Sequence, residues 1–252
     1  MSYEKLISAL CITYGRHLLL EEAIESFLKQ DYPNKEMIII NDLPEQTLIF
    51  EHPQIKIFNF KKRFSTIGEK RNKSVEMSKG DILTSWDDDD IYLPWLLSRL
   101  VKEFELQPDI GFVQPGKAWY LSNDKIEQTK GWCAHSAFTR ESFDKVNGYQ
   151  IMNSGQDMDL LNRLKKYLTS KRYKEVVFSP EEACYIFRWS GTGSYHLSGY
   201  GRDKEGKISG FNKIEEFIKS NPIESIVKLK PHWKKDYLQM TRDFLNMNIT
   251  TA

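Results

Sequence analysis

Short runs of apolar β-formers that alternate with a helical pattern constrain the fold of this chain more than any other feature. Such runs cover residues 5–12, 37–40 and 55–60, and residues 18–29 carry apolar side chains at helical spacing. Strand, helix and strand in this order are typical of βαβ units, whose strands lie in one mainly parallel sheet. The sequence therefore predicts an α/β fold with buried first strands.

A run of four carboxylates follows a further predicted strand. Residues 82–86 are rich in β-formers and lead directly into Asp87, Asp88, Asp89 and Asp90. Like charges repel one another, and open α/β sheets bind ligands just beyond the carboxyl ends of their strands. Hard divalent cations such as Mg²⁺, Mn²⁺ or Ca²⁺ favour oxygen ligands. The run is either a metal site, which the strand leading into it favours, or a solvated acidic loop.

A basic segment precedes the acidic strand. It extends from Lys61 to Lys73, contains Gly68, and passes into a short, weakly amphipathic helix that ends near Ser78. Lys61, Lys62 and Arg63 themselves are expected on the surface. A cationic loop and an anionic loop would then flank one short helix, an arrangement that suits a phosphate and its metal ion.

The rest of the chain mixes helices and short strands. Pro94 fits the first turn of a helix. The pattern predicts helices over 95–106, 139–148 and 157–168, and strands over 111–114, 118–121, 133–138, 175–178 and 183–187. From residue 211 the pattern is helical, with a break at 221–222 and no strand signal. We therefore expect a domain over residues 1–205 and a helical C-terminal extension over 206–252 packed on it.

Composition places the chain among soluble globular proteins. Its 252 residues are 40% hydrophobic and 28% charged, and a net charge of +1 gives no general attraction to nucleic acid or membrane. No apolar run approaches the roughly 20 residues that span a bilayer. Cys11, Cys133 and Cys184 lack metal-ligand spacing, and an odd count without a signal peptide favours a reducing compartment. We expect a cytoplasmic protein.

Several motifs along the chain, taken in order, carry a family resemblance. They are Cys11–Arg16, similar to I-P-T-Y-N-R; Ser26–Pro33, similar to S-x-L-x-Q-T-Y-P; Ile38–Asp42, similar to I-I-V-D-D; Lys70–Asn72, similar to A-R-N; Trp86–Pro94, similar to D-x-D-D…P; and Val146–Leu160, similar to G-G-F…E-D-x-D-L. In this order they resemble the family 2 glycosyltransferases over about residues 5–170. Cys11, Ile12, Gly15 and Gln156 depart from the family pattern.

The resemblance implies a GT-A fold, a Rossmann-like mixed and mainly parallel sheet flanked by helices. It also implies an inverting enzyme that moves a sugar from a nucleoside diphosphate, with UDP favoured, to an acceptor hydroxyl, here expected on a glycan. A divalent cation, Mn²⁺ or Mg²⁺, would neutralise the diphosphate as it leaves. Asp89 would ligate the cation directly as the second aspartate of a D-x-D pair, and Asp87 would lie nearer the ribose and the metal shell. The run also permits a register that uses Asp88 or Asp90.

Further roles are implied by the same resemblance. His196, in a glycine-rich loop, would be an additional metal ligand, although a lone histidine is also a common surface residue. The residues expected to bind the nucleotide are Thr13, Tyr14, Arg16, Asp42, Lys70, Arg71, Asp87 and Asp88. Asp42 would accept hydrogen bonds from the base and Tyr14 would stack on it. A turn cap at Asp42 and solvated arginine and lysine side chains are the alternative interpretations.

Asp157 is the candidate general base. It would take the proton of the acceptor hydroxyl as that oxygen attacks the anomeric carbon from the face opposite the leaving group. An aspartate at the start of a helix is also stabilised by the helix dipole, and the two roles are compatible. Gln156, where the family has glutamate, cannot carry that charge.

Two further functions stay open at this point. The acceptor could be a protein or a hydroxylated nucleobase, although the near-neutral net charge argues against a nucleic acid partner. Alternatively, the acidic run could belong to a non-catalytic module that binds metal or carbohydrate. A module of that kind predicts metal binding without nucleotide binding.

Overall fold

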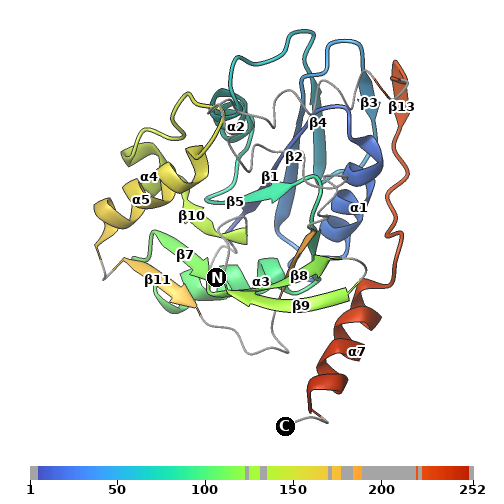
Figure 1. The fold of residues 1–252 in the computed structure, drawn as a ribbon. Helices are drawn as coiled ribbons and strands as arrows, with labels where there is room; N and C mark the ends of the chain where they lie inside the picture. The colour runs from blue at the N-terminus through green and yellow to red at the C-terminus, as the bar shows by residue number, and fades with distance from the viewer. Residues whose placement is uncertain are drawn as a thin grey trace, which may run out of the picture.

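The computed structural model describes residues 5–122, 125–130, 135–169, 172–176, 184–188, 220 and 223–249. Within them, a seven-stranded sheet forms the centre of the molecule (Figure 1). In spatial order its strands are β11 (Tyr173–Val176), β7 (Phe112–Pro115), β10 (Ala137–Thr139), β5 (Ile82–Asp87), β1 (Ile7–Thr13), β2 (Lys35–Asn41) and β4 (Ile55–Asn59). β1 pairs in parallel with β2 and β5, whereas β10 is antiparallel to β5 and β7. The predicted mixed, mainly parallel sheet is confirmed.

Helices cover both faces of this sheet. They are α1 (His17–Leu28), α2 (Ile67–Glu76), α3 (Leu96–Leu106), α4 (Arg140–Lys145) and α5 (Gln156–Leu168). In β1, Ala9 and Cys11 join the apolar cluster that contains α1 and α3, whereas Leu10 joins the cluster that contains residues of α2 and α5. Because both faces are buried, β1 reads as a continuous apolar run rather than an alternating one.

A second, smaller sheet lies beside the acidic run. It consists of β6 (Ile91–Tyr92), β12 (Tyr185–Arg188), β8 (Lys117–Ser122) and β9 (Lys125–Lys130). The sequence did not predict β9, since its residues are mostly polar and its pairing with β8 supplies the order. The strand predicted over 133–138 begins only at Ala137 among the described residues. β6 follows the acidic run directly and pairs with β12, so this sheet holds one side of the run.

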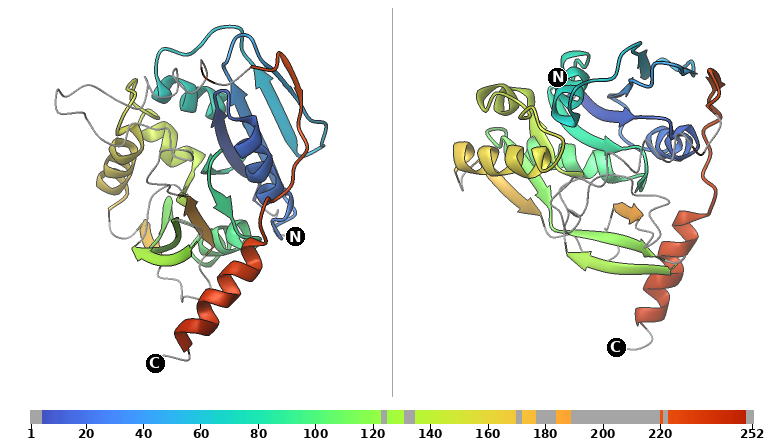
Figure 2. Two further views of the ribbon diagram at one scale, coloured as in Figure 1. Left: turned by 45° about the vertical axis from the view of Figure 1, so that its right-hand side comes forward. Right: turned by 45° about the horizontal axis from the view of Figure 1, so that its top comes forward.

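The C-terminal segment departs from the helical prediction. A short strand, β13 (Ile226–Lys228), pairs in parallel with β3 (Thr47–Ile49), and α7 begins at Tyr237 and ends at Ile249. The expectation of no strand was therefore wrong, because three residues are too few to give a sequence pattern and β3 provides the hydrogen bonds. Figures 1 and 2 show this segment, in red, running from β13 past α1 to α7 near β9. In the described residues, no helix is both long enough and apolar enough to cross a membrane.

Candidate functional site

The acidic run lies at the carboxyl edge of the central sheet. β5 ends at Asp87, which is aligned with Ile12 of the neighbouring strand β1. The side chain of Asp87 is 26% exposed, whereas those of Asp88 and Asp89 are 1% and 6% exposed. The run is therefore not a solvated acidic loop, because three of its four residues, Asp90 included, are buried.

Arg16 neutralises two of these carboxylates. It follows β1, and its Nη1 donates to Asp89 Oδ2 over 2.9 Å while its Nε donates to Asp88 Oδ2 over 3.2 Å. Nη2 of Arg16 also pairs with Asp88. Burial raises the pKa of Asp88 to about 6, although the charge of Arg16 opposes this rise. The predicted nucleotide-binding residue Arg16 and the predicted metal-binding carboxylates thus form one cluster.

Arg71 binds Asp87, the most exposed carboxylate of the run. Its Nη2 donates to Asp87 Oδ1 over 3.0 Å and its Nη1 to Ser85 Oγ over 3.2 Å. The guanidinium lies 5.8 Å from the centre of the Tyr149 ring. Burial works to lower the pKa of Arg71, but the charges of Asp87, Tyr149 and Asp157, in that order, raise it overall. The arginine on α2 thereby lies within the electrostatic reach of both the acidic run and the predicted base.

Lys70 and Asp42 form a buried pair next to the turn after β1. Lys70 Nζ bonds Asp42 Oδ1 and also donates to the main-chain oxygen of Thr13 over 2.6 Å. The second oxygen of Asp42 accepts the main-chain N–H of Phe64 over 2.9 Å. Burial lowers the pKa of Lys70, whereas Asp42 raises it. The two predicted nucleotide-binding residues lie together, but each already contacts the protein.

Arg63 was expected on the surface, but its guanidinium lies over the Tyr14 ring, 4.1 Å from the ring centre. Lys70 lies on the same ring at 5.8 Å. Residues 61 and 62 are exposed, as expected. The basic segment gave no signal that would separate Arg63 from its neighbours, because only the tertiary fold brings the loop onto Tyr14.

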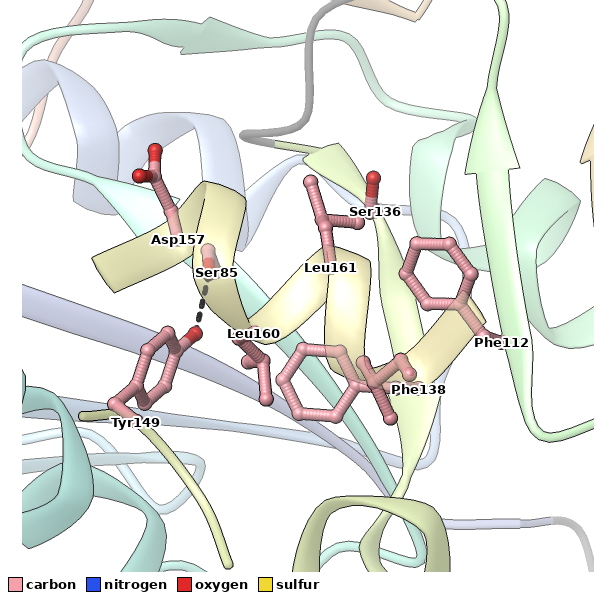
Figure 3. A pocket seen from close by; sticks show the side chains of 9 residues that line it. Ser85, Phe112, Ser136, Phe138, Tyr149, Asp157, Leu160 and Leu161 are labelled. Carbon is pink, nitrogen blue, oxygen red and sulfur yellow. Dashed lines mark hydrogen bonds between the residues drawn. The ribbon is translucent and has the colours of Figure 1, made fainter. Parts of the chain in front are cut away.

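Asp157 lies in the first turn of α5, at a small pocket (Figure 3). The polar lining consists of Ser85, Ser136, Tyr149 and Asp157, and the apolar lining of Phe112, Phe138, Leu160, Leu161 and Leu164. Ser85 Oγ and Tyr149 OH are hydrogen-bonded at 3.2 Å, and Asp157 Oδ1 accepts the N–H of Met158 over 2.8 Å. Gly155, with φ of 75°, starts the helix without a side-chain cap. Asp157 thus lies in the first helical turn, where the helix dipole stabilises an aspartate, and it also borders a pocket.

The last member of the run, Asp90, faces the second sheet. It accepts the hydroxyl of Tyr185 and, over 2.8 Å, the main-chain N–H of Arg188. Burial raises its pKa well above the usual value, and the neighbouring aspartates add to the rise. Asp90 is thus held by β12, apart from the two arginines that bind the other three carboxylates.

The described residues contain no group of three or more histidine, cysteine, aspartate or glutamate side chains arranged to hold a metal ion. His196 lies outside the described residues. Cys11 and Cys184 are buried free thiols.

Comparison with known proteins places these observations in a family. The sequence model described as "Glycosyl transferase family 2" matches residues 8–168. An "Uncharacterized glycosyltransferase" of Haemophilus influenzae is 25% identical over 193 residues, covering 67% of this chain and 65% of the relative. The "GalNAc(5)-diNAcBac-PP-undecaprenol beta-1,3-glucosyltransferase" of Campylobacter jejuni is 29% identical over 191 residues, covering 71% of this chain and 58% of the relative. The chain thus spans somewhat less than two thirds of the length of these relatives.

Among solved structures, S. aureus TarS 1-349 in complex with UDP-GlcNAc superimposes with a TM-score of 0.60 at 15% identity. The match covers 98% of this chain and 73% of TarS. A likeness at this identity concerns the fold alone, and it agrees with the GT-A arrangement expected from the motifs.

Proposed function

Because the chain belongs to glycosyl transferase family 2, whose model covers more than half of it, we propose that it moves a sugar from a nucleoside diphosphate to an acceptor hydroxyl with inversion. The observation that carries the proposal is the cluster of Asp87, Asp88 and Asp89 with Arg16 and Arg71 at the carboxyl ends of β1 and β5. Ligands bind open α/β sheets at this edge. UDP is the favoured nucleotide, supported by the TarS complex with UDP-GlcNAc.

We assign the nucleoside to the turn after β1. Tyr14 offers a stacking face, Thr13 lines the pocket, and Asp42 accepts a hydrogen bond from the base. Asp42 already accepts two hydrogen bonds, from Lys70 and from the main chain of Phe64. An ionised carboxylate has about four acceptor positions, so these two bonds leave capacity for a base N–H.

The donor set of the run suits Mn²⁺ or Mg²⁺. Carboxylate oxygens are the ligands these hard cations prefer, and the run already attracts the cationic groups of Arg16 and Arg71. Asp87 and Asp89 would hold the metal. The bond between Asp90 and the main chain of Arg188 in β12 supports this choice, because it engages Asp90 elsewhere. The metal, when bound, would neutralise the diphosphate as a Lewis acid. His196 remains a proposed additional ligand.

The two arginines and Lys70 serve the diphosphate in this proposal. A guanidinium binds phosphate oxygens in a bidentate manner, and Arg16 and Arg71 already present their donors at the site. Asp88 stays the partner of Arg16. Removing either arginine would therefore weaken nucleotide binding, and removing Arg16 would also leave the buried carboxylates of Asp88 and Asp89 without their countercharge.

Asp157 takes the proton of the acceptor hydroxyl. Its charge acts on Arg71, which binds Asp87, and this supports a common site for the base and the acidic run. The hydroxyl oxygen attacks the anomeric carbon as the bond to the diphosphate breaks on the opposite face, and the proton passes to Asp157. A glycan acceptor is supported by the name of the Campylobacter relative.

A donor screen tests this function. Release of nucleotide is measured for a panel of UDP-, GDP- and dTDP-sugars, with Mn²⁺ or Mg²⁺ and with glycan, protein and hydroxylated-nucleobase acceptors. We expect turnover with a UDP-sugar and a glycan, and a loss of about 100-fold or more in Asp89→Ala, the scale of a lost charge-stabilising group. Asp81→Ala, at an exposed aspartate just before β5, is the matched control. Full activity in Asp89→Ala would contradict the metal assignment.

A thermal-shift measurement separates the enzyme from a binding module. A ligand that binds only the folded state stabilises it by RT ln(1 + L/Kd), where L is the free ligand concentration, so the unfolding temperature rises as that concentration exceeds the Kd. The proposal expects a larger shift with UDP and Mn²⁺ together than with Mn²⁺ alone. Equal shifts would identify a metal-binding module instead.

A further inference from the structure

A buried ion pair connects the first helix with the second sheet. Arg188, at the end of β12, bonds Glu22 of α1, and each side chain is only 1% exposed. Removing two charges from water is unfavourable unless hydrogen bonds compensate for the lost hydration. Burial raises the pKa of Glu22, but the charge of Arg188 and hydrogen bonds from Lys234 and Tyr237 lower it overall. The pair is therefore charged and held from several sides.

The same arginine holds the acidic run. Its Nε donates to the main-chain oxygen of Asp89, and its main-chain N–H donates to Asp90 Oδ1 over 2.8 Å. Tyr185, also on β12, donates its hydroxyl to Asp90. The turn that presents the proposed metal ligands is thus bound to β12 by both its main chain and a side chain.

The C-terminal segment binds Glu22, the partner of Arg188. Glu22 Oε1 accepts the main-chain N–H of Lys234 over 3.0 Å and the hydroxyl of Tyr237 over 2.9 Å. Nη1 of Arg188 lies 3.4 Å from that hydroxyl. Figure 2 shows this segment running from β13 to α7. In sequence it lies after residues 8–168, which the family model matches.

We propose that Glu22, Arg188 and Tyr237 are positioning residues that fix the turn at Asp89–Asp90 and so orient the carboxylates toward the donor diphosphate. None of the three contacts the donor in this proposal, and Arg188 acts on the turn while Glu22 and Tyr237 hold Arg188. The catalytic part rests on the proposed function. Because Tyr237 contacts Arg188 and Arg188 contacts Asp89 and Asp90, the proposal connects the C-terminal segment to the donor site through Arg188.

Hydrogen exchange and nucleotide binding of the full chain test this proposal with Tyr237→Phe and Glu22→Gln. Tyr237→Phe removes one hydroxyl and keeps the ring, so it remains informative if Glu22→Gln fails to fold. Ser26→Ala is the matched control, because Ser26 accepts the indole N–H of Trp233 over 2.9 Å and so also joins α1 to the C-terminal segment without contacting Arg188.

We expect the amides of Asp88–Ile91 to exchange about tenfold faster in both variants without ligand, the ratio that corresponds to about 1.4 kcal/mol. We also expect the Kd of UDP with Mn²⁺ to rise about tenfold. Ser26→Ala should match the wild type in both measurements, and thermal unfolding of all variants reports any global loss of stability.

The possible failures are distinct. If exchange at Asp88–Ile91 in Tyr237→Phe equals that in Ser26→Ala, the positioning role is wrong whatever the enzyme binds. If exchange rises but the Kd stays at the wild-type value, the turn is held by the network and donor binding does not depend on it, which also overturns the proposal. A wild-type protein that binds no nucleoside diphosphate overturns the proposed function, while the exchange measurement still decides whether the network holds the turn.

Discussion

At the scale of single residues, four successive aspartates become four different groups. Asp87 meets Arg71, Asp88 and Asp89 meet Arg16, and Asp90 meets Tyr185 and Arg188. Burial and the charge of Arg16 act in opposite directions on the pKa of Asp88, and burial prevails and raises it to about 6. Identical side chains therefore acquire separate roles from their neighbours in space.

Asp157 and Asp159 provide a matched pair for testing the proposed base. Asp157 borders the pocket, whereas Asp159 is bound to Arg163, one helical turn further along α5. We expect Asp157→Asn to lower kcat by about 10²- to 10⁴-fold, because the amide cannot accept the hydroxyl proton. Donor binding by calorimetry should stay within a few-fold of the wild type. Normal turnover in Asp157→Asn, or an equal loss in Asp159→Asn, would remove Asp157 from the mechanism.

At the scale of elements, hydrogen bonds to the main chain join α2 to the loop before α5. Gly68 donates its N–H to the main-chain oxygen of Met152 over 3.1 Å. The side-chain amide of Asn72 donates to the main-chain oxygen of Tyr149 over 2.8 Å, and its Oδ1 accepts the main-chain N–H of Tyr149 over 2.9 Å. These contacts hold the helix that carries Lys70 and Arg71 against the segment that leads to Asp157. The distance between donor and acceptor parts of the site thus depends on how closely α2 approaches this loop.

Gly68→Ala tests that close approach. A Cβ at Gly68 would lie 1.8 Å from the main-chain oxygen of Gln150, so helix or loop must move. We expect the free energy of unfolding to fall by about 1–3 kcal/mol, the usual cost of overpacking, measured by urea denaturation. Glu76→Ala on the exposed end of the same helix should change it by no more than about 0.5 kcal/mol. A stability of Gly68→Ala equal to that of the wild type would mean that the two elements separate at little cost.

At the scale of the whole molecule, the C-terminal segment joins parts that are distant in sequence. β13 extends β3, Trp233 binds α1, and Phe244 of α7 packs edge-on against Trp119 of β8 at 5.0 Å. The segment therefore contacts the β3 edge, the first helix and the second sheet. The buried pair of Glu22 and Arg188 also contacts this segment, at Lys234 and Tyr237.

The acid stability of the protein should depend on that pair. The pKa of Glu22 is lower in the folded protein than its usual 4.5, so the unfolded chain binds this proton at higher pH than the folded protein does. The stabilising contribution of Glu22 is thus complete above pH 4.5 and is lost as the pH falls through its folded pKa. We expect the difference in unfolding free energy between wild type and Glu22→Gln to be constant near neutral pH and to shrink below pH 4.5, measured by urea denaturation. A difference that stays constant at acid pH would show that Glu22 is not held in its charged form.

The sequence by itself determined the α/β class, the order of the main strands and helices, and the place of the acidic run at the end of a strand. Apolar periodicity and turn residues are local signals, and β1, α1, β2, α3 and α5 carry them over enough residues to be read. The short strand β13 and the polar strand β9 carry no such signal, because their order comes from the strands they pair with. His196, which the motifs also suggested, lies outside the described residues.

Only the tertiary structure decided which partner each charged side chain meets. Arg16 and Asp88 are 72 positions apart, and Glu22 and Arg188 are 166 positions apart. Arg63 lies over Tyr14 although its neighbours Lys61 and Lys62 are exposed. Long-range contacts of this kind depend on how the elements pack, which periodicity along the chain does not encode. They determine which carboxylates face the proposed donor and which are held by the protein.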